Sequence, residues 1–373
     1  MSREEKTTSS DLFVSIFFVI FISFVASSTL SAYIIEPFMR DGSIHNRPRF
    51  TINHDALETI ANDKNPSVIA IGSSMIFKGL DGGCVSTQLD DNISVYNLGQ
   101  VMSRPYTDML HIPGIVNAKP DLVLVEIGPN LLFNTTGSNQ LEYVELRFKL
   151  DSMYQTSVDV GGWIELIEPE HRSWLAMNEF ERMKFRQEYV PKALEERLLN
   201  LLMDETFRPE WIYPGLYGWV PESDSSEWKN YLQTPIFPDD SFGFDGMSKV
   251  ERDEYNLTHM KGASGYHPIN NSQSHLVLDY EINILLESGI KVMIVTPPQH
   301  PSSLDYVEAG QWDILNETID QFLQLENVSL FSQLWEQGWE DDHFYDRNHL
   351  DDEGRVEFCQ RLAPAIEEVM DIG

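Results

Sequence analysis

The sequence is poor in basic residues. It has 26 Lys and Arg against 59 Asp and Glu, which gives a formal net charge of -33 at pH 7. A surface with this charge repels phosphate backbones, so the composition argues against a nucleic-acid partner. The acidic residues are spread along the chain rather than collected in a tail, which indicates a strongly solvated surface and is compatible with a salt-adapted source.

Cysteine is almost absent, with only Cys84 and Cys359 in the chain. Two cysteines match neither a disulfide framework nor a zinc site. They form a single bridge or stay as two buried free thiols, and the sequence leaves both alternatives open. A Gly-rich phosphate loop and a His cluster with metal-ligand spacing are also missing, so we expect no cofactor and no metal.

Residues 12–35 carry no charge, and this run is the strongest feature of the amino terminus. It exceeds the roughly 20 residues that span a bilayer and the roughly 7–15 residues of a signal-peptide core. It also has no polar face, which argues against a buried core helix. We therefore expect a tail at 1–11 and a single transmembrane anchor at 12–35, with a cleaved signal as the alternative.

The side of the membrane is less clear from the sequence. Basic residues stand on both sides of the run, so the positive-inside rule is ambiguous, although long domains translocate largely regardless of charge. Glycosylation acceptor motifs are compatible with an exported domain. They occur at Asn92, Asn134, Asn256, Asn270, Asn316 and Asn327.

Beyond the anchor, strand-like and helix-like patterns alternate. Short apolar runs predict strands at 67–72, 93–99, 121–128, 290–298 and 328–332, and helical patterns lie between them, as at 273–288. Continuous apolar runs are typical of strands buried on both faces. The sequence therefore predicts an α/β fold with a mostly parallel, doubly covered sheet.

Residues 131–272 do not follow this alternation. They contain a helical pattern at 173–204 and an aromatic segment at 211–220, and they are too long for a simple connection. We interpret them as an insertion that caps the active-site edge. The remaining ranges are a lead-in at 36–60 and a catalytic domain made of 61–130 and 273–373.

The aromatic segment of the insertion has two interpretations. Its rings suit the apolar faces of sugars, or they simply pack the loop against itself. The residues concerned are Trp211, Tyr213, Tyr217 and Trp219.

Polar turns follow the first three predicted strands, where ligands bind in open parallel sheets. Ser73 and Ser74 come after the first strand, Gly99 after the second and Asn130 after the third. Near the carboxyl end, Asp346 stands three positions before His349, a spacing at which two side chains are neighbours across one turn.

A carboxylate next to an imidazole provides the base and the orienting group that a serine nucleophile needs. His343 is a competing base with less favourable spacing. Near the same edge, Arg104, Tyr106 and His300 are either packing residues or substrate contacts.

Taken in order, the Ser, the Gly, the Gly-x-Asn and the Asp-x-x-His resemble the SGNH (GDSL-type) hydrolase superfamily over 60–130 and 288–370. The resemblance implies that Ser74 is the nucleophile and that Asp346 and His349 complete the triad. It implies an oxyanion hole made by the N–H groups of Ser74 and Gly99 and the amide of Asn130, each donor contributing about 3 kcal/mol.

Two positions depart from the family pattern. Ser73 stands where block I usually has an acid, and Leu131 stands where the last acid of Gly-x-Asn-Asp is usual. With its single predicted span, the chain is more similar to a membrane-anchored subset. That subset includes the D-alanine transfer protein of teichoic acids and alginate-type O-acetyltransferase components.

The resemblance implies a serine acyltransferase or esterase acting on acyl esters, chiefly O-acetyl esters, of extracytoplasmic glycans. It also implies a single-pass protein with its catalytic domain outside the cytoplasm and a membrane-bound acyl-donor protein as partner. Two alternatives stay open: a general hydrolase of lipid or small esters, and a catalytically inactive partner that presents polymer to a membrane acyltransferase.

Overall fold

The computed structural model covers the chain in several described stretches. The structure places the following residues well enough to describe, and we call them the described residues: 9–30, 32–33, 50–128, 138–154, 162–188, 232–233, 250–251, 254, 273–301, 312–334, 336, 338–344, 346 and 348–370.

The centre of the described structure is a parallel sheet of five strands in the order β2-β1-β3-β4-β5. Its strands are β1 (Ser67–Ile71), β2 (Ser94–Asn97), β3 (Leu122–Glu126), β4 (Lys291–Thr296) and β5 (Val328–Ser332). β1 lies between β2 and β3, and Ile69 is in register with Tyr96 on one side and Val123 on the other. The predicted α/β class and all five predicted strands are confirmed.

Helices connect the strands, as the alternating patterns predict. They are α3 (Phe50–Ala61), α4 (Ser74–Gly79), α5 (Gly82–Gln88), α6 (Pro105–Asp108), α7 (Ile112–Ala118), α13 (Gln273–Glu287), α15 (Asp313–Phe322) and α16 (Asp352–Met370). The predicted helix at 273–288 is α13, and α16 contains Pro364.

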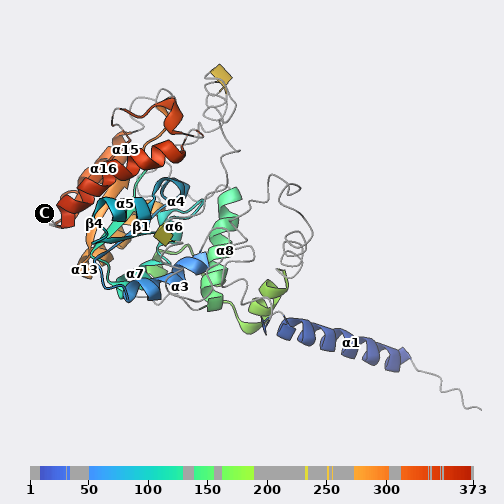
Figure 1. Cartoon of the computed structure of the whole chain (residues 1–373). Helices are drawn as coiled ribbons and strands as arrows, with labels where there is room; N and C mark the ends of the chain where they lie inside the picture. Colours follow the sequence, from blue (N-terminus) through green and yellow to red (C-terminus); the bar gives the residue numbers. More distant parts are fainter. Residues whose placement is uncertain are drawn as a thin grey trace, which may run out of the picture.

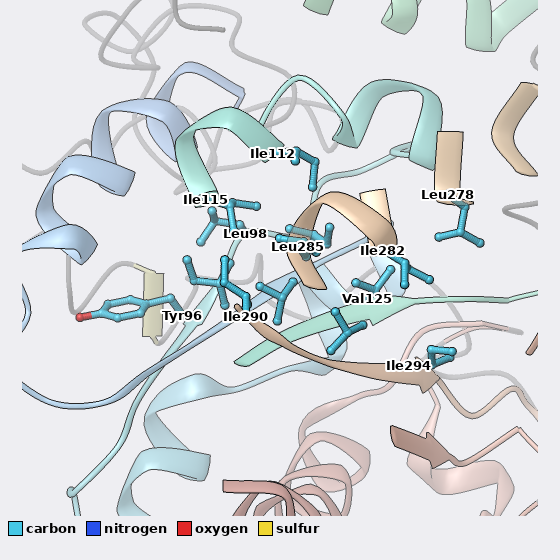
Figure 2. Close-up of a cluster of buried hydrophobic side chains, with 14 of the residues drawn as sticks. Tyr96, Leu98, Ile112, Ile115, Val125, Leu278, Ile282, Leu285, Ile290 and Ile294 are labelled. Carbon is cyan, nitrogen blue, oxygen red and sulfur yellow. The ribbon is translucent and has the colours of Figure 1, made fainter. Parts of the chain in front are cut away.

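Apolar side chains from alternate strand positions belong to two core clusters. One contains Ile69, Val123 and Ile294 together with residues of α3, α7, α13 and α15 (Figure 2). The other contains Val68 and Leu124 together with residues of α5 and α16. Because successive residues of a strand point to opposite faces, this division follows from the apolar strand runs.

The lead-in before the first strand contributes a core helix. Within α3, Ile52, Leu57 and Ile60 are buried in the first cluster, so the folded part of the chain begins by Phe50.

The described part of the predicted insertion packs on the same body. It forms α8 (Ser138–Tyr154), the 3₁₀ helix η2 (Trp163–Leu166) and α9 (Arg172–Leu175), and residues 179–188 are also helical. Phe148 and Trp163 share a third apolar cluster with Tyr106 of α6 and Val277 of α13. The predicted helical pattern at 173–204 is described only to residue 188.

The apolar amino-terminal run forms α1 (Ser9–Leu30), which projects away from the sheet-bearing body (Figure 1). Leu12–Leu30 are long and apolar enough to cross a membrane, and none of this segment is buried in the protein. A signal sequence passes the same test. The helix contacts the insertion, because Phe24 lies 6.0 Å from Phe180 between ring centroids and Gln187 Nε2 donates to Ser27 Oγ at 2.9 Å.

Cys84 of α5 and Cys359 of α16 form a disulfide across 275 positions of sequence. This decides between the two alternatives that the sequence leaves open. The bridge joins two helices that contact each other over the second core cluster.

Candidate active site

Three predicted site residues form a continuous chain of hydrogen bonds at the carboxyl end of the sheet. His349 Nε2 lies 2.8 Å from Ser74 Oγ, and His349 Nδ1 lies 2.7 Å from Asp346 Oδ2. The side chains of His349 and Asp346 are 18% and 23% exposed, so the pair is partly shielded but open to a reactant. Nucleophile, base and orienting carboxylate therefore occupy the relative positions that acyl transfer requires.

Asp346 is held by its own local turn. Its Oδ1 accepts the backbone N–H groups of Asn348 and His349, each at 2.8 Å, and this leaves Oδ2 for the imidazole. Burial raises the pKa of Asp346, but the charge of His349 and the hydrogen bonds from His349 and Asn348 have the larger, opposite effect. The net result is a pKa of about 2. Asp346 is therefore ionised near neutral pH and fixes the proton of His349 on Nδ1.

Ser74 is the first residue of α4, directly after the turn that ends β1. Ser73 caps this helix, because its Oγ accepts the Met75 N–H at 3.2 Å and its carbonyl accepts the Phe77 N–H at 2.9 Å. The two adjacent serines therefore have different roles: Ser73 caps the helix, and Ser74 contacts His349.

The N–H group of Ser74 has no acceptor among the described residues. It therefore remains available to an oxyanion that forms on a carbonyl attacked by Ser74 Oγ.

The geometry does not support the predicted oxyanion role of Gly99. Its N–H donates to Asn97 Oδ1 at 2.9 Å. Asn97 in turn donates through Nδ2 to the carbonyls of Ile76, Phe77 and Leu80 at the end of α4. A Cβ at Gly99 would lie 2.5 Å from Phe77 N, so the glycine is needed for close packing against α4. Asn130, the third predicted donor, lies outside the described residues.

Two of the three residues that the sequence leaves open as packing residues or substrate contacts are buried, as packing residues are. Tyr106 is 0% exposed, and its hydroxyl bonds to His171 Nδ1 and accepts the Glu168 N–H, each at 3.0 Å. His300 is also 0% exposed, with Nε2 3.4 Å from Asp341 Oδ1. Neither side chain has surface left for a substrate.

The other candidates near the site have different outcomes. Arg104 is half-buried beside α6 at the predicted edge and keeps its place as a candidate contact. His343 lies in the 3₁₀ helix η4 (Asp341–His343), where its Nδ1 accepts the Glu340 N–H at 3.0 Å, so His349 and not His343 contacts Ser74. Trp211, Tyr213, Tyr217 and Trp219 lie outside the described residues.

Glu126 at the end of β3 is a site residue that the sequence analysis missed. Its side chain is 3% exposed, and Oε2 accepts the Ser73 N–H at 2.5 Å while Oε1 accepts Ser73 Oγ–H at 2.9 Å. The available signal was a single acid at the end of the apolar run "LVLVE", where a buried carboxyl needs a specific partner.

Arg147 of α8 is a second missed residue, and it holds the loop that follows Gly99. This fully buried guanidinium donates to Val101 O at 2.7 Å, Thr107 Oγ1 at 2.7 Å and Ser103 Oγ at 3.2 Å. Burial lowers the pKa of Arg147 to about 10 and raises that of the neighbouring Asp108 to about 7. The first helix of the insertion therefore supports the site loop from inside the protein.

The described residues contain no group of three or more His, Cys, Asp or Glu side chains that could hold a metal ion. The chemistry visible at this edge is that of a serine, an imidazole and a carboxylate. Comparison of the sequence with protein-family models and with characterised proteins finds no match.

Proposed function

We propose that this protein is a membrane-anchored serine acyltransferase or esterase of the SGNH type, acting on acyl esters, chiefly O-acetyl esters, of extracytoplasmic glycans. The single observation that carries the proposal is the hydrogen-bond chain from Ser74 Oγ through His349 to Asp346. The three-layer SGNH fold, with a doubly covered sheet and an insertion that caps the active site, is part of the same proposal.

In the proposed reaction, Ser74 Oγ attacks the acyl carbonyl while its proton passes to His349 Nε2. The carbonyl oxygen becomes an oxyanion that the Ser74 N–H stabilises. When the tetrahedral intermediate collapses, the bond to the leaving alcohol breaks and His349 returns the proton to that alcohol. Water or a glycan hydroxyl then attacks the acyl-serine with His349 as base, which gives hydrolysis or transfer.

The location outside the cytoplasm rests on several separate observations. Disulfides persist mainly in oxidising compartments, and Cys84 and Cys359 are paired. The acceptor asparagines Asn92, Asn316 and Asn327 are all exposed, whereas the other three acceptor motifs lie outside the described residues. The α1 helix supplies a span of sufficient length.

The test of the proposed function has two stages. A fluorophosphonate probe should label wild-type protein at Ser74, because the probe needs a serine activated by a base. Product analysis with an acetyl ester, in water alone and with a glycan acceptor, then separates hydrolysis from transfer. If the wild-type protein neither reacts with the probe nor turns over the ester, the proposed enzyme function fails and the inactive presenting partner becomes the favoured alternative.

A further inference from the structure

The carboxyl of Glu126 lies directly behind the nucleophile turn. Besides its two contacts with Ser73, it interacts with the Ile76 N–H in the first turn of α4. Glu126 comes from β3 and Ser73 follows β1, and these two strands are neighbours in the sheet. The contact therefore ties the start of α4 to the adjacent strand.

Gly72 provides the room for this carboxyl. A Cβ at position 72 would lie 2.4 Å from Glu126 Oε2 and 2.9 Å from Ile76 Cγ1, and the residue has φ of 153°. Both facts favour glycine at this position. The glycine before the serines is therefore matched to a carboxyl on a different strand.

The partners of the first N–H groups of α4 show what Glu126 does for Ser74. The Ser73 N–H donates to Glu126 Oε2, the Met75 N–H donates to Ser73 Oγ, and the Ile76 N–H interacts with the Glu126 carboxyl. Helix N-termini leave their first N–H groups without intrahelical partners, and here each of these three has found one. Of these first N–H groups, that of Ser74 has no acceptor among the described residues, and it lies where an oxyanion would form.

The charge of this carboxyl matters because of where it lies. An ionised Glu126 would place a negative charge beside the first turn of α4, which contains the Ser74 N–H. This charge would offset the positive field that the helix start directs at an oxyanion. Burial raises the pKa of Glu126 to about 7, against the lowering effect of hydrogen bonds from Ser73 and Ile76. The carboxyl therefore exchanges its proton near neutral pH.

Other ionisable groups surround this part of the site. Asp108 of α6 interacts electrostatically with Glu126, and also with Arg147 of α8 and Glu281 of α13. His349 lies across Ser74. None of these places a cation in hydrogen-bond contact with Glu126 among the described residues, so its neighbours there are the Ser73 and Ile76 dipoles.

We propose that Glu126 is a positioning residue for Ser74, which in its protonated form holds the nucleophile turn without placing negative charge beside the oxyanion. A neutral carboxyl can donate to Ser73 Oγ through one oxygen and accept the Ser73 N–H through the other, so it keeps both contacts. The inference rests on the proposed serine chemistry. It adds that activity falls at alkaline pH, when Glu126 loses its proton.

The test measures the rate of inactivation by a fluorophosphonate across pH in the detergent-solubilised full chain. The wild-type rate should fall above about pH 7, by up to about tenfold per pH unit. Glu126→Gln keeps a neutral isostere, so its rate should not fall there. Ser73→Ala removes a hydrogen bond that lowers the pKa of Glu126, so the fall should move to higher pH.

Glu281→Gln is the matched control, because it replaces a buried carboxyl that interacts with Asp108, whereas the carboxyl that bonds to Ser73 is that of Glu126. This variant should keep the alkaline fall of the wild type. The inference is overturned when the fall persists unchanged in Glu126→Gln, or when a folded Glu126→Gln reacts slowly at every pH. A wild type that is inert toward the probe rejects the proposed function itself, which is a different result.

Thermal unfolding gives a readout that does not depend on reactivity. Glu126 has a folded-state pKa raised above the unfolded value, so wild type loses stability as pH rises from about 4.5 to about 7. Gln cannot ionise, so the thermal midpoint of Glu126→Gln relative to that of wild type should increase between about pH 4.5 and about pH 7 and then level off. A pH-independent difference would mean that Glu126 does not titrate in this range, and the inference would fail.

Discussion

His349 Nε2 lies 2.8 Å from Ser74 Oγ, although 275 positions separate the two residues in the sequence. The serine is placed by β1 and the start of α4, and the histidine by the turn that precedes α16. The Cys84–Cys359 bridge joins α16 to α5, which follows α4 directly. The two halves of the site are therefore joined covalently as well as by packing.

The paired serines give the first prediction. Ser74→Ala should abolish fluorophosphonate labelling and lower turnover of a chromogenic acetyl ester by roughly 10³-fold or more, because the nucleophile is lost. Ser73→Ala should keep most activity near neutral pH at the expense of roughly 1 kcal/mol of stability from the lost helix cap. Loss of labelling in Ser73→Ala with retention in Ser74→Ala would reverse the assignment.

The orienting carboxylate gives the second prediction. Asp346→Asn should keep the fold but lower ester turnover by roughly 10²–10⁴-fold, because the amide no longer fixes the His349 tautomer. Fluorophosphonate labelling should slow in parallel, since both reactions need the same base. Wild-type rates in Asp346→Asn would show that the carboxylate does not assist His349.

The lowered pKa of Asp346 also predicts how stability depends on pH. The folded-state value of about 2 lies below the ordinary 3.8, so ionised Asp346 contributes up to about 2 kcal/mol above about pH 4. This contribution is lost as pH falls toward about 2. The difference in unfolding free energy between wild type and Asp346→Asn should therefore shrink over that range, and a constant difference would contradict the assigned interaction.

Much of the fold can be predicted from the sequence because its signals are local. Each strand is a continuous apolar run, and Asp346 and His349 are three positions apart on one turn. Glu126 and Arg147 carry no such signal. Their partners Ser73 and Val101 lie 53 and 46 positions away, and only the folded chain brings them together.

Motif order also cannot show how a residue uses its hydrogen bonds. Gly99 has the position of an oxyanion donor, but the neighbouring Asn97 side chain takes its N–H. Tyr106 lies near the correct edge, but the insertion packs over it and bonds its hydroxyl. Both outcomes depend on competition between partners, which composition and spacing do not describe.

The buried guanidinium of α8 gives the fourth prediction. Arg147→Met should destabilise the protein by roughly 3–5 kcal/mol. Asp108 loses the positive charge beside it, and three oxygen acceptors lose their hydrogen-bond donor. The double variant Arg147→Met with Asp108→Asn should lose less unfolding free energy than the sum of the two single losses, because the buried carboxyl that interacts with Arg147 is removed together with the guanidinium. Denaturant unfolding measures both, and strict additivity would mean that the two groups are not coupled.

The contact between α1 and the insertion gives the last prediction. No core-cluster residue precedes Phe50 among those described, so deletion of residues 1–36 should release a folded domain from the membrane fraction. Deletion also removes Phe24 and Ser27, which pack against Phe180 and Gln187. Phe180 is already 63% exposed, and the deletion exposes it further.

An exposed aromatic ring of this kind favours self-association. Phe180→Ser should therefore make the truncated domain more monodisperse in size-exclusion chromatography. Val356→Ser is the matched control, because Val356 is an apolar side chain, 51% exposed, on α16, which lies far from α1 (Figure 1). A truncated domain that stays with the membrane would show that α1 is not the main anchor. If the two substitutions change the monodispersity equally, the self-association is not caused by exposing Phe180.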